Sequence, residues 1–129
     1  MSFKALLIVK AAVCVVFVPI LLFAPRQLFG FLGASLGPAG SFPAREYGAA
    51  LMGTFLLTWL ARNVAESLAR RAILVDLLVY DAIGFIVTVR AIVVGMLNPL
   101  GWGIAVVYLF FTLGPAYLLL RKTTQAANT

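Results

Sequence analysis

The chain has 129 residues, of which 64% are hydrophobic and only 11% are charged. A soluble domain averages about 25% charged residues, so this composition excludes a water-facing fold, which would expose large apolar patches and aggregate. The net charge is +6, and the basic residues lie at the ends of apolar stretches rather than in a run with interleaved aromatics. This placement favours anionic lipid head groups as partners and argues against nucleic acid.

Four long apolar stretches occupy most of the chain. A helix needs roughly 20 apolar residues to cross a bilayer core of about 30 Å. The sequence therefore predicts one all-α integral membrane domain over residues 1–129, with four transmembrane helices in an up-down bundle. The predicted spans are 4–24, 46–64, 72–96 and 102–120.

An interfacial segment, 25–45, connects the first two predicted spans. It contains glycines and prolines typical of turns, yet it is also rich in Leu and Phe. Residues 28, 29, 32 and 36 follow helical spacing, which indicates a short amphipathic helix in the outer interface. Two interpretations stay open for this segment. It folds back over the bundle, or it forms a docking surface for another subunit or a pigment-like lipid, with Phe29, Phe31, Leu32 and the interfacial Trp102 as candidates.

The third predicted span carries Asp76, Asp81 and Arg90, and the first carries Lys10. Charged groups within a bilayer are costly and usually pair with one another or face water. The four charges sum to zero. Lys10 is expected to pair with Asp76 or Asp81, and Arg90 with Glu46. One hypothesis is a set of structural ion pairs, and the alternative is an ion or proton path in which Asp81 titrates.

A stripe of small residues shares the helix face of Asp81. Its members are Gly84, Thr88, Ala91 and Gly95, and side chains of this size let helices approach closely. The stripe predicts a helix-packing seam that includes Asp81.

The fourth predicted span begins after a tight turn, and its aromatic residues are expected to face lipid or a neighbouring subunit. These residues are Tyr108, Phe110, Phe111 and Tyr117. A polar tail, 122–129, follows the span.

The distribution of basic residues predicts the topology. Four spans would place both termini and the middle loop on one side, which carries Lys4, Arg62, Arg70, Arg71, Arg121 and Lys122. The opposite side carries Arg26 and Arg45, with Arg90 near its edge. Because Lys and Arg concentrate in cytoplasmic loops, both termini are expected in the cytoplasm, in a bacterial inner membrane.

The chain contains no histidine and only one cysteine, Cys14, so no catalytic or metal site is predicted. The leading hypothesis is a non-catalytic accessory subunit of a larger respiratory or photosynthetic membrane complex, or a homo-oligomer, in contact with lipid, quinone or pigment. The first alternative is a small oligomeric transporter or channel that uses Asp81, and the second is a membrane enzyme. The chain resembles the small multidrug transporters in size and span number, but its first span carries Lys10 and no acidic residue, whereas those proteins carry a membrane glutamate there.

Overall fold

The protein is all-helical in the computed structural model, which describes the backbone of residues 1–127 and the side chains of residues 1–121. Its five helices are α1 (Phe3–Phe23), α2 (Pro25–Phe31), α3 (Pro38–Ala61), α4 (Leu68–Val93) and α5 (Gly101–Ala127). Three segments are long and apolar enough to cross a membrane: Phe3–Phe23, Leu68–Val93 and Gly101–Arg121. The span predicted over 46–64 is not among them, because α3 begins with a more polar stretch that includes Arg45 and Glu46.

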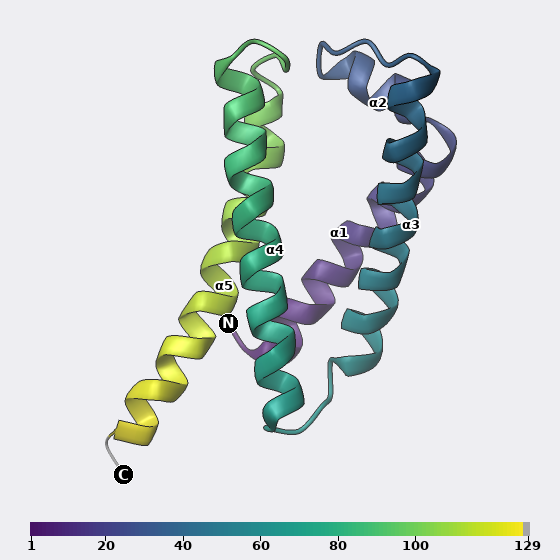
Figure 1. The fold of residues 1–129 in the computed structure, drawn as a ribbon. Helices are drawn as coiled ribbons and strands as arrows, with labels where there is room; N and C mark the ends of the chain where they lie inside the picture. The colour runs from purple at the N-terminus through teal and green to yellow at the C-terminus, as the bar shows by residue number, and fades with distance from the viewer. Residues whose placement is uncertain (128–129) are drawn as a thin grey trace.

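The helices form two pairs rather than one evenly packed bundle. Helix α3 packs along α1, and α5 packs along α4. Figure 1 shows the pairs close together near the start of α1 and separated at the end where α2 lies.

Two apolar cores explain this arrangement. The first joins the pairs, since Phe3 and Leu6 of α1 pack with Leu74 of α4 and Phe111 of α5. The second lies mainly within the α1–α3 pair and is built on Cys14, Val18, Leu21 and Leu51. The pairs therefore share a core at one end and have separate apolar surfaces toward the other.

Much of the predicted interfacial segment 25–45 is helical. Helix α2 begins at Pro25, and α3 begins at Pro38, well before residue 46. Proline favours the first turn of a helix because its fixed φ suits the helix and its missing N–H needs no partner there. Arg26 Nε donates a hydrogen bond of 3.3 Å to Ser41 Oγ, which ties α2 to the start of α3. Of the positions with helical spacing, Leu28 and Phe29 lie in α2, whereas Leu32 and Leu36 lie beyond its end.

The other boundaries also have local causes. Ser67 caps α4, and its Oγ accepts a hydrogen bond from the Arg70 amide. Gly95 has a φ of +82°, so the chain has left the helix before Met96. Helix α5 continues to Ala127 and includes most of the predicted polar tail 122–129, of which residues 128 and 129 lie outside the described residues.

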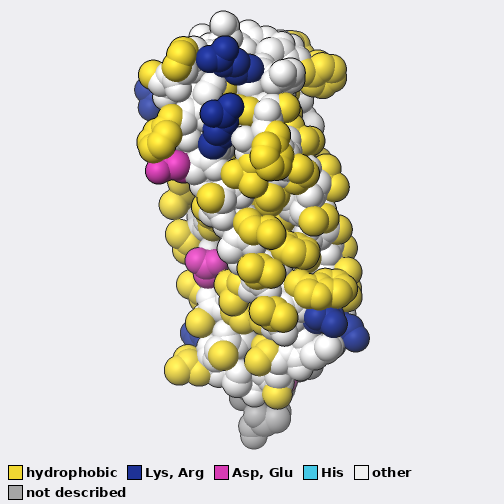
Figure 2. All heavy atoms as spheres, turned by 90° about the vertical axis from the view of Figure 1, so that its right-hand side faces the viewer, with side chains coloured by type: hydrophobic (Ala, Val, Ile, Leu, Met, Phe, Trp, Pro, Cys, Tyr) yellow, Lys and Arg dark blue, Asp and Glu magenta, His cyan; other side chains and the backbone are white. Residues whose placement is uncertain are grey.

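The outer surface is largely apolar between its two ends, although Figure 2 also shows an Asp or Glu side chain near mid-height. Figure 2 shows hydrophobic side chains over most of one face, with Lys and Arg gathered toward its two ends. Exposed aliphatic side chains occur on every long helix. A surface of this kind is suited to lipid, which agrees with the three candidate membrane-spanning segments.

Candidate functional site: a cavity between the helix pairs

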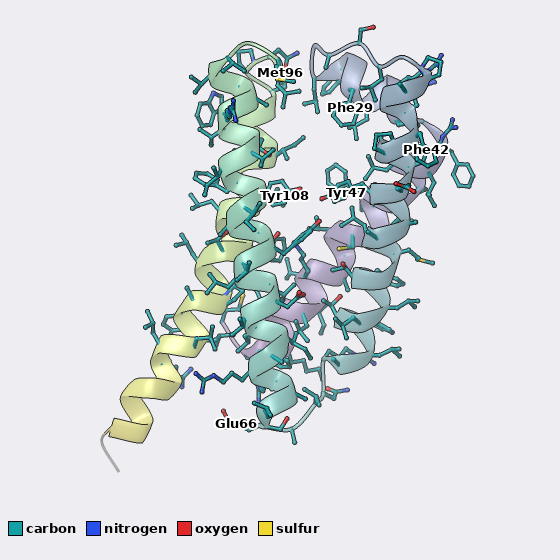
Figure 3. The ribbon with its side chains drawn as sticks, viewed as in Figure 1. Phe29, Phe42, Tyr47, Glu66, Met96 and Tyr108 are labelled. Atoms are coloured by element: carbon teal, nitrogen blue, oxygen red, sulfur yellow. The ribbon has the colours of Figure 1, made fainter. Side chains whose placement is uncertain are left out.

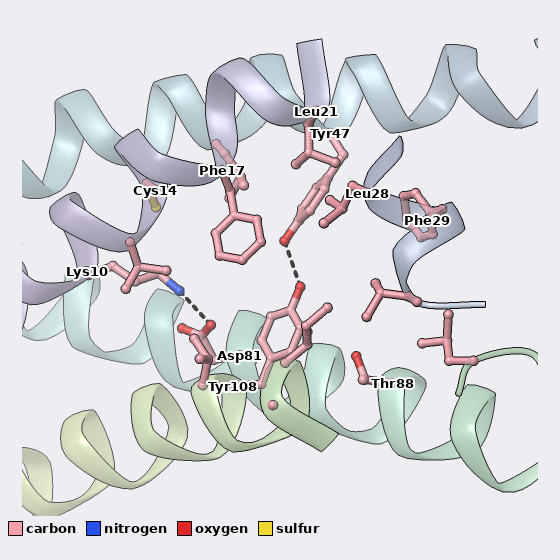
Figure 4. Close-up of a pocket in the computed structure, with 17 residues that line it drawn as sticks. Lys10, Cys14, Phe17, Leu21, Leu28, Phe29, Tyr47, Asp81, Thr88 and Tyr108 are labelled. Atoms are coloured by element: carbon pink, nitrogen blue, oxygen red, sulfur yellow. Dashed lines mark hydrogen bonds and ion pairs between the residues drawn. The ribbon is translucent and has the colours of Figure 1, made fainter. Parts of the chain in front are cut away.

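A cavity of about 250 Å³ lies where the two helix pairs separate. All five helices contribute to its wall, for example Phe17 of α1, Phe29 of α2, Leu51 of α3, Thr88 of α4 and Ile104 of α5. Most of the wall is apolar, but a few polar side chains gather on it (Figure 4).

The far end of the cavity is closed by a contact between two loops. The Asn98 amide donates to the carbonyl of Leu32 at 2.8 Å, and Asn98 Nδ2 donates to the carbonyl of Phe31 at 3.0 Å. Asn98 lies between α4 and α5, whereas Phe31 and Leu32 end α2. These bonds therefore hold the two pairs together at the end opposite their shared core.

A buried ion pair crosses from one helix pair to the other. The Nζ atom of Lys10 in α1 lies 2.6 Å from Oδ1 of Asp81 in α4. Lys10 is 4% exposed and Asp81 is fully buried. Two opposite charges at this separation attract strongly in a medium of low dielectric constant, and their formal charges cancel.

Two aromatic rings lie beside the Lys10 ammonium. Its Nζ lies 4.5 Å from the ring centroid of Phe111 and 5.1 Å from that of Tyr80. Such contacts stabilise a cation where water is excluded. The second carboxylate oxygen of Asp81, Oδ2, is buried and has no hydrogen-bond partner among the described residues. The pair is thus neutral as a unit, but its hydrogen bonding is incomplete.

Three tyrosine hydroxyls meet beside this ion pair. Tyr80 donates to the Tyr47 oxygen at 2.7 Å, and the Tyr47 and Tyr108 oxygens lie 2.6 Å apart. Tyr47 comes from α3, Tyr80 from α4 and Tyr108 from α5. Figure 3 shows Tyr47 and Tyr108 pointing toward each other across the space between the helix pairs. These side chains form a second polar link between the pairs.

Thr88 is a further polar residue on the cavity wall. It is 9% exposed, and its hydroxyl makes no hydrogen bond within the described part of the chain. Figure 4 places it on α4, along the cavity from the Lys10–Asp81 pair.

Only part of the predicted packing seam on α4 lies at a helix contact. A Cβ added at Gly84 would lie closer than 3.0 Å to atoms of the Tyr108 ring, so Gly84 permits the close approach of α5. Thr88 is buried and Ala91 is partly buried. Gly95 lies in the turn after the helix, so it does not belong to the packing surface.

The remaining predicted charges lie apart from the cavity. Asp76 and Arg90 are both exposed on α4, and Glu46 is exposed on α3. Among the residues that the structure describes, Arg90 and Glu46 form no ion pair. Of the four intramembrane charges singled out in the sequence, the structure brings only Lys10 and Asp81 together.

The predicted docking residues separate into two groups. Phe29 and Leu32 line the cavity, and Leu32 is buried. Phe31 is 68% exposed, and Trp102 is exposed as well. Phe31 and Trp102 are therefore accessible from outside the molecule, whereas Phe29 and Leu32 belong to the cavity wall.

Sequence reasoning missed the inward aromatic residues. Phe111 is 1% exposed and Tyr108 lines the cavity, although both were expected to face lipid or another subunit. The buried positions Gly101, Ala105, Phe111, Pro115 and Leu118 recur every three or four residues, with a gap at 108 that Tyr108 fills. This spacing shows only once burial is known, because apolar residues occupy most positions of α5.

Comparison with known proteins does not assign the chain to a family. The chain matches no protein family, no curated protein and no solved structure.

Proposed function

We propose that this protein is a non-catalytic integral membrane protein that binds a neutral, largely apolar molecule between its two helix pairs. The observation that carries the proposal is the cavity itself, which has a mostly apolar wall with a few polar groups along it. Binding sites for small molecules are typically concave and mostly apolar, with a few placed polar groups. A volume of about 250 Å³ accommodates the head of a lipid-like molecule, whose chain would extend into the bilayer.

The proposal includes α3 as a fourth span. Its 24 residues, at about 1.5 Å each, give roughly 36 Å, which exceeds a bilayer core of about 30 Å. Ser2, Arg70 and Arg121 line one pocket, so the start of α1, the start of α4 and the end of α5 lie at the same end of the molecule. If α1, α4 and α5 span the membrane, α3 has to cross it to reach the start of α4.

The two ends of the molecule differ in basic residues. The end that holds the start of α1 carries Lys4, Arg62, Arg70, Arg71 and Arg121. The other end carries Arg26 and Arg45, with Arg90 in the last turn of α4. By the positive-inside rule we propose that the first end is cytoplasmic, as in a bacterial inner membrane.

An accessory role in a larger membrane complex is compatible with this binding function. Presenting a lipid or quinone to a neighbouring enzyme requires no catalytic residue in this chain. Co-purification from native membranes, followed by mass spectrometry of the partners, tests this part of the proposal. Recovery of the chain only as a free monomer or homodimer would contradict it.

The geometry supports an ion path through Asp81 less well than it supports the binding function. Its carboxylate is fully buried and paired with Lys10 at 2.6 Å. A path of this kind predicts that Asp81→Asn changes proton or cation flux in proteoliposomes. Our proposal predicts the same flux for Asp81→Asn and wild type.

The binding function is tested by filling the cavity. Gly103 lines it, and a Cβ added there meets no atom within 4 Å, so Gly103→Leu adds bulk without a clash. Gly53→Leu is the matched control, because a Cβ at Gly53 also meets open space and Gly53 does not line the cavity. We expect native mass spectrometry to detect a bound neutral molecule in wild type and Gly53→Leu, and at least tenfold less of it in Gly103→Leu. Equal retention in both variants would refute the proposal.

A further inference from the structure

We infer that the cavity selects a long-chain molecule whose polar end is a carbonyl oxygen, held by a tyrosine hydroxyl and the Thr88 hydroxyl. This inference rests on the proposed binding function and specifies the chemical class of the ligand.

The tyrosine cluster contains one hydrogen-bond donor more than it uses. Three hydroxyls supply three protons, but the cluster makes only two hydrogen bonds, Tyr80 to Tyr47 and the bond between Tyr47 and Tyr108. Tyr80 also interacts with the Tyr108 hydroxyl, but no hydrogen bond of ordinary length joins these two oxygens among the described residues. Since Tyr80 donates its proton to Tyr47, the unused proton belongs to Tyr47 or Tyr108. Both of these residues line the cavity, and Tyr80 does not.

Thr88 provides a second unused hydroxyl. A threonine within a helix commonly donates to the carbonyl of the preceding turn. Thr54, Thr58 and Thr112 all do so, at 3.2, 2.8 and 2.8 Å. Thr88 makes no such bond, although it is nine-tenths buried and lines the cavity. The Thr88 hydroxyl therefore has a free donor at the cavity wall, and an oxygen of the ligand would accept from it.

The charges in the cavity favour a neutral ligand. Lys10 and Asp81 neutralise each other, and the ammonium is flanked by the rings of Phe111 and Tyr80. An ionised head group would find no free counter-charge there, and its desolvation would be uncompensated. A carbonyl oxygen is neutral and has two lone pairs, so one such oxygen has the capacity to accept two hydrogen bonds.

The test compares two probes of equal chain length, a long-chain methyl ketone and the corresponding alkene. Native mass spectrometry of the protein in detergent measures the affinity of each probe, and the ratio of the two affinities is the readout. This ratio does not depend on the fraction of protein that is folded. We expect wild type to prefer the ketone by about tenfold, the effect of two ordinary hydrogen bonds.

The variants assign this preference to particular hydroxyls. Thr88→Val keeps the side-chain shape and removes one donor, and the double variant Tyr47→Phe, Tyr108→Phe removes both tyrosine hydroxyls on the cavity wall. Each is expected to lower the preference about threefold or more. Tyr80→Phe is the matched control, since it also removes a hydroxyl from the cluster but leaves one unused proton on Tyr47 or Tyr108. We expect this control to keep the tenfold preference.

Several results would overturn the inference. Equal binding of ketone and alkene by wild type would overturn it while leaving the proposed binding function intact. Failure of both probes to bind would refute the binding function as well. A loss of preference in Tyr80→Phe as large as in the double variant would contradict the proton assignment. Tighter binding of a long-chain carboxylate or alkylammonium than of the ketone would contradict a neutral ligand.

Discussion

Lys10 of α1 holds Asp81 of α4 at 2.6 Å, and this is the one ion pair between the two helix pairs among the residues whose side chains are described. Both groups are buried, and Oδ2 of Asp81 has no hydrogen-bond partner among those residues. An incompletely hydrogen-bonded pair adds little net stability, but removal of one member leaves a buried charge alone. We therefore expect the pair to determine which surfaces of the two helix pairs meet, and to add little to the free energy of unfolding.

The first prediction concerns the loss of one charge. Lys10→Met leaves the Asp81 carboxylate buried without a cation. We therefore expect the free energy of unfolding in detergent micelles to fall by about 3 kcal/mol. The double variant Lys10→Met, Asp81→Leu removes both charges and is expected to recover most of this loss. Asp76→Asn, which changes an exposed carboxylate on the same helix, is the control with little expected effect. A double variant no more stable than Lys10→Met would contradict this account of the pair.

The second prediction concerns the contact of α4 with α5. Gly84→Ala places a Cβ against the Tyr108 ring and is expected to destabilise the protein by about 1–3 kcal/mol, the usual effect of overpacking. Gly53→Ala meets open space, and the better helix propensity of alanine should make it neutral or stabilising. Thermal unfolding of the two variants in the same detergent measures the difference. Equal stability of the two would show that Gly84 is not at a close contact.

The third prediction concerns the contact that closes the end of the cavity. Asn98→Ala removes the side-chain bonds to the Phe31 carbonyl and the Leu100 amide. We expect faster amide hydrogen exchange in residues 31–37 and 95–100, because these loops would open locally more often. Asn63→Ala, at an exposed asparagine in another loop, serves as the control. Unchanged exchange in Asn98→Ala would indicate that apolar packing alone closes this end.

The fourth prediction separates two buried threonines. Thr58 is fully buried and hydrogen-bonded, so Thr58→Val should destabilise the unliganded protein by about 1 kcal/mol. Thr88→Val replaces a hydroxyl that has no partner and should be neutral or stabilising by a similar amount. Thermal unfolding after exhaustive delipidation checks this contrast. Destabilisation by Thr88→Val equal to that by Thr58→Val would contradict the unpartnered state of Thr88.

The sequence predicted the helical membrane architecture and two of the charges in the site because these signals are local. A long apolar run indicates a helix wherever it lies, and the insertion cost of Lys10 and Asp81 requires partners. The pairing of Lys10 with Asp81, rather than with Asp76, depends on which face of α4 turns inward. That choice is made by packing against α1 and α5, and residues 10 and 81 are far apart in the sequence.

The rest of the site could not be predicted because it is assembled from several helices. Tyr47, Tyr80 and Tyr108 come from three helices, and no spacing along the chain relates them. The sequence also does not predict that the Thr88 hydroxyl lacks a hydrogen bond, because Thr112 and Thr58 occur in similar apolar helices. The start of α3 was missed for a different reason, because Pro38 was interpreted as a turn residue although it begins a helix.

The most direct test of the central claim is the position of a bound probe. Crystals grown in lipid with a brominated long-chain methyl ketone would locate the bromine by anomalous scattering and the ketone head by its density. We predict one head group in the cavity, with its oxygen in hydrogen-bond distance of Thr88 Oγ1 and of the Tyr47 or Tyr108 hydroxyl. Ketone found only on the outer, lipid-facing surface, with the cavity filled by the protein's own side chains, would contradict the account.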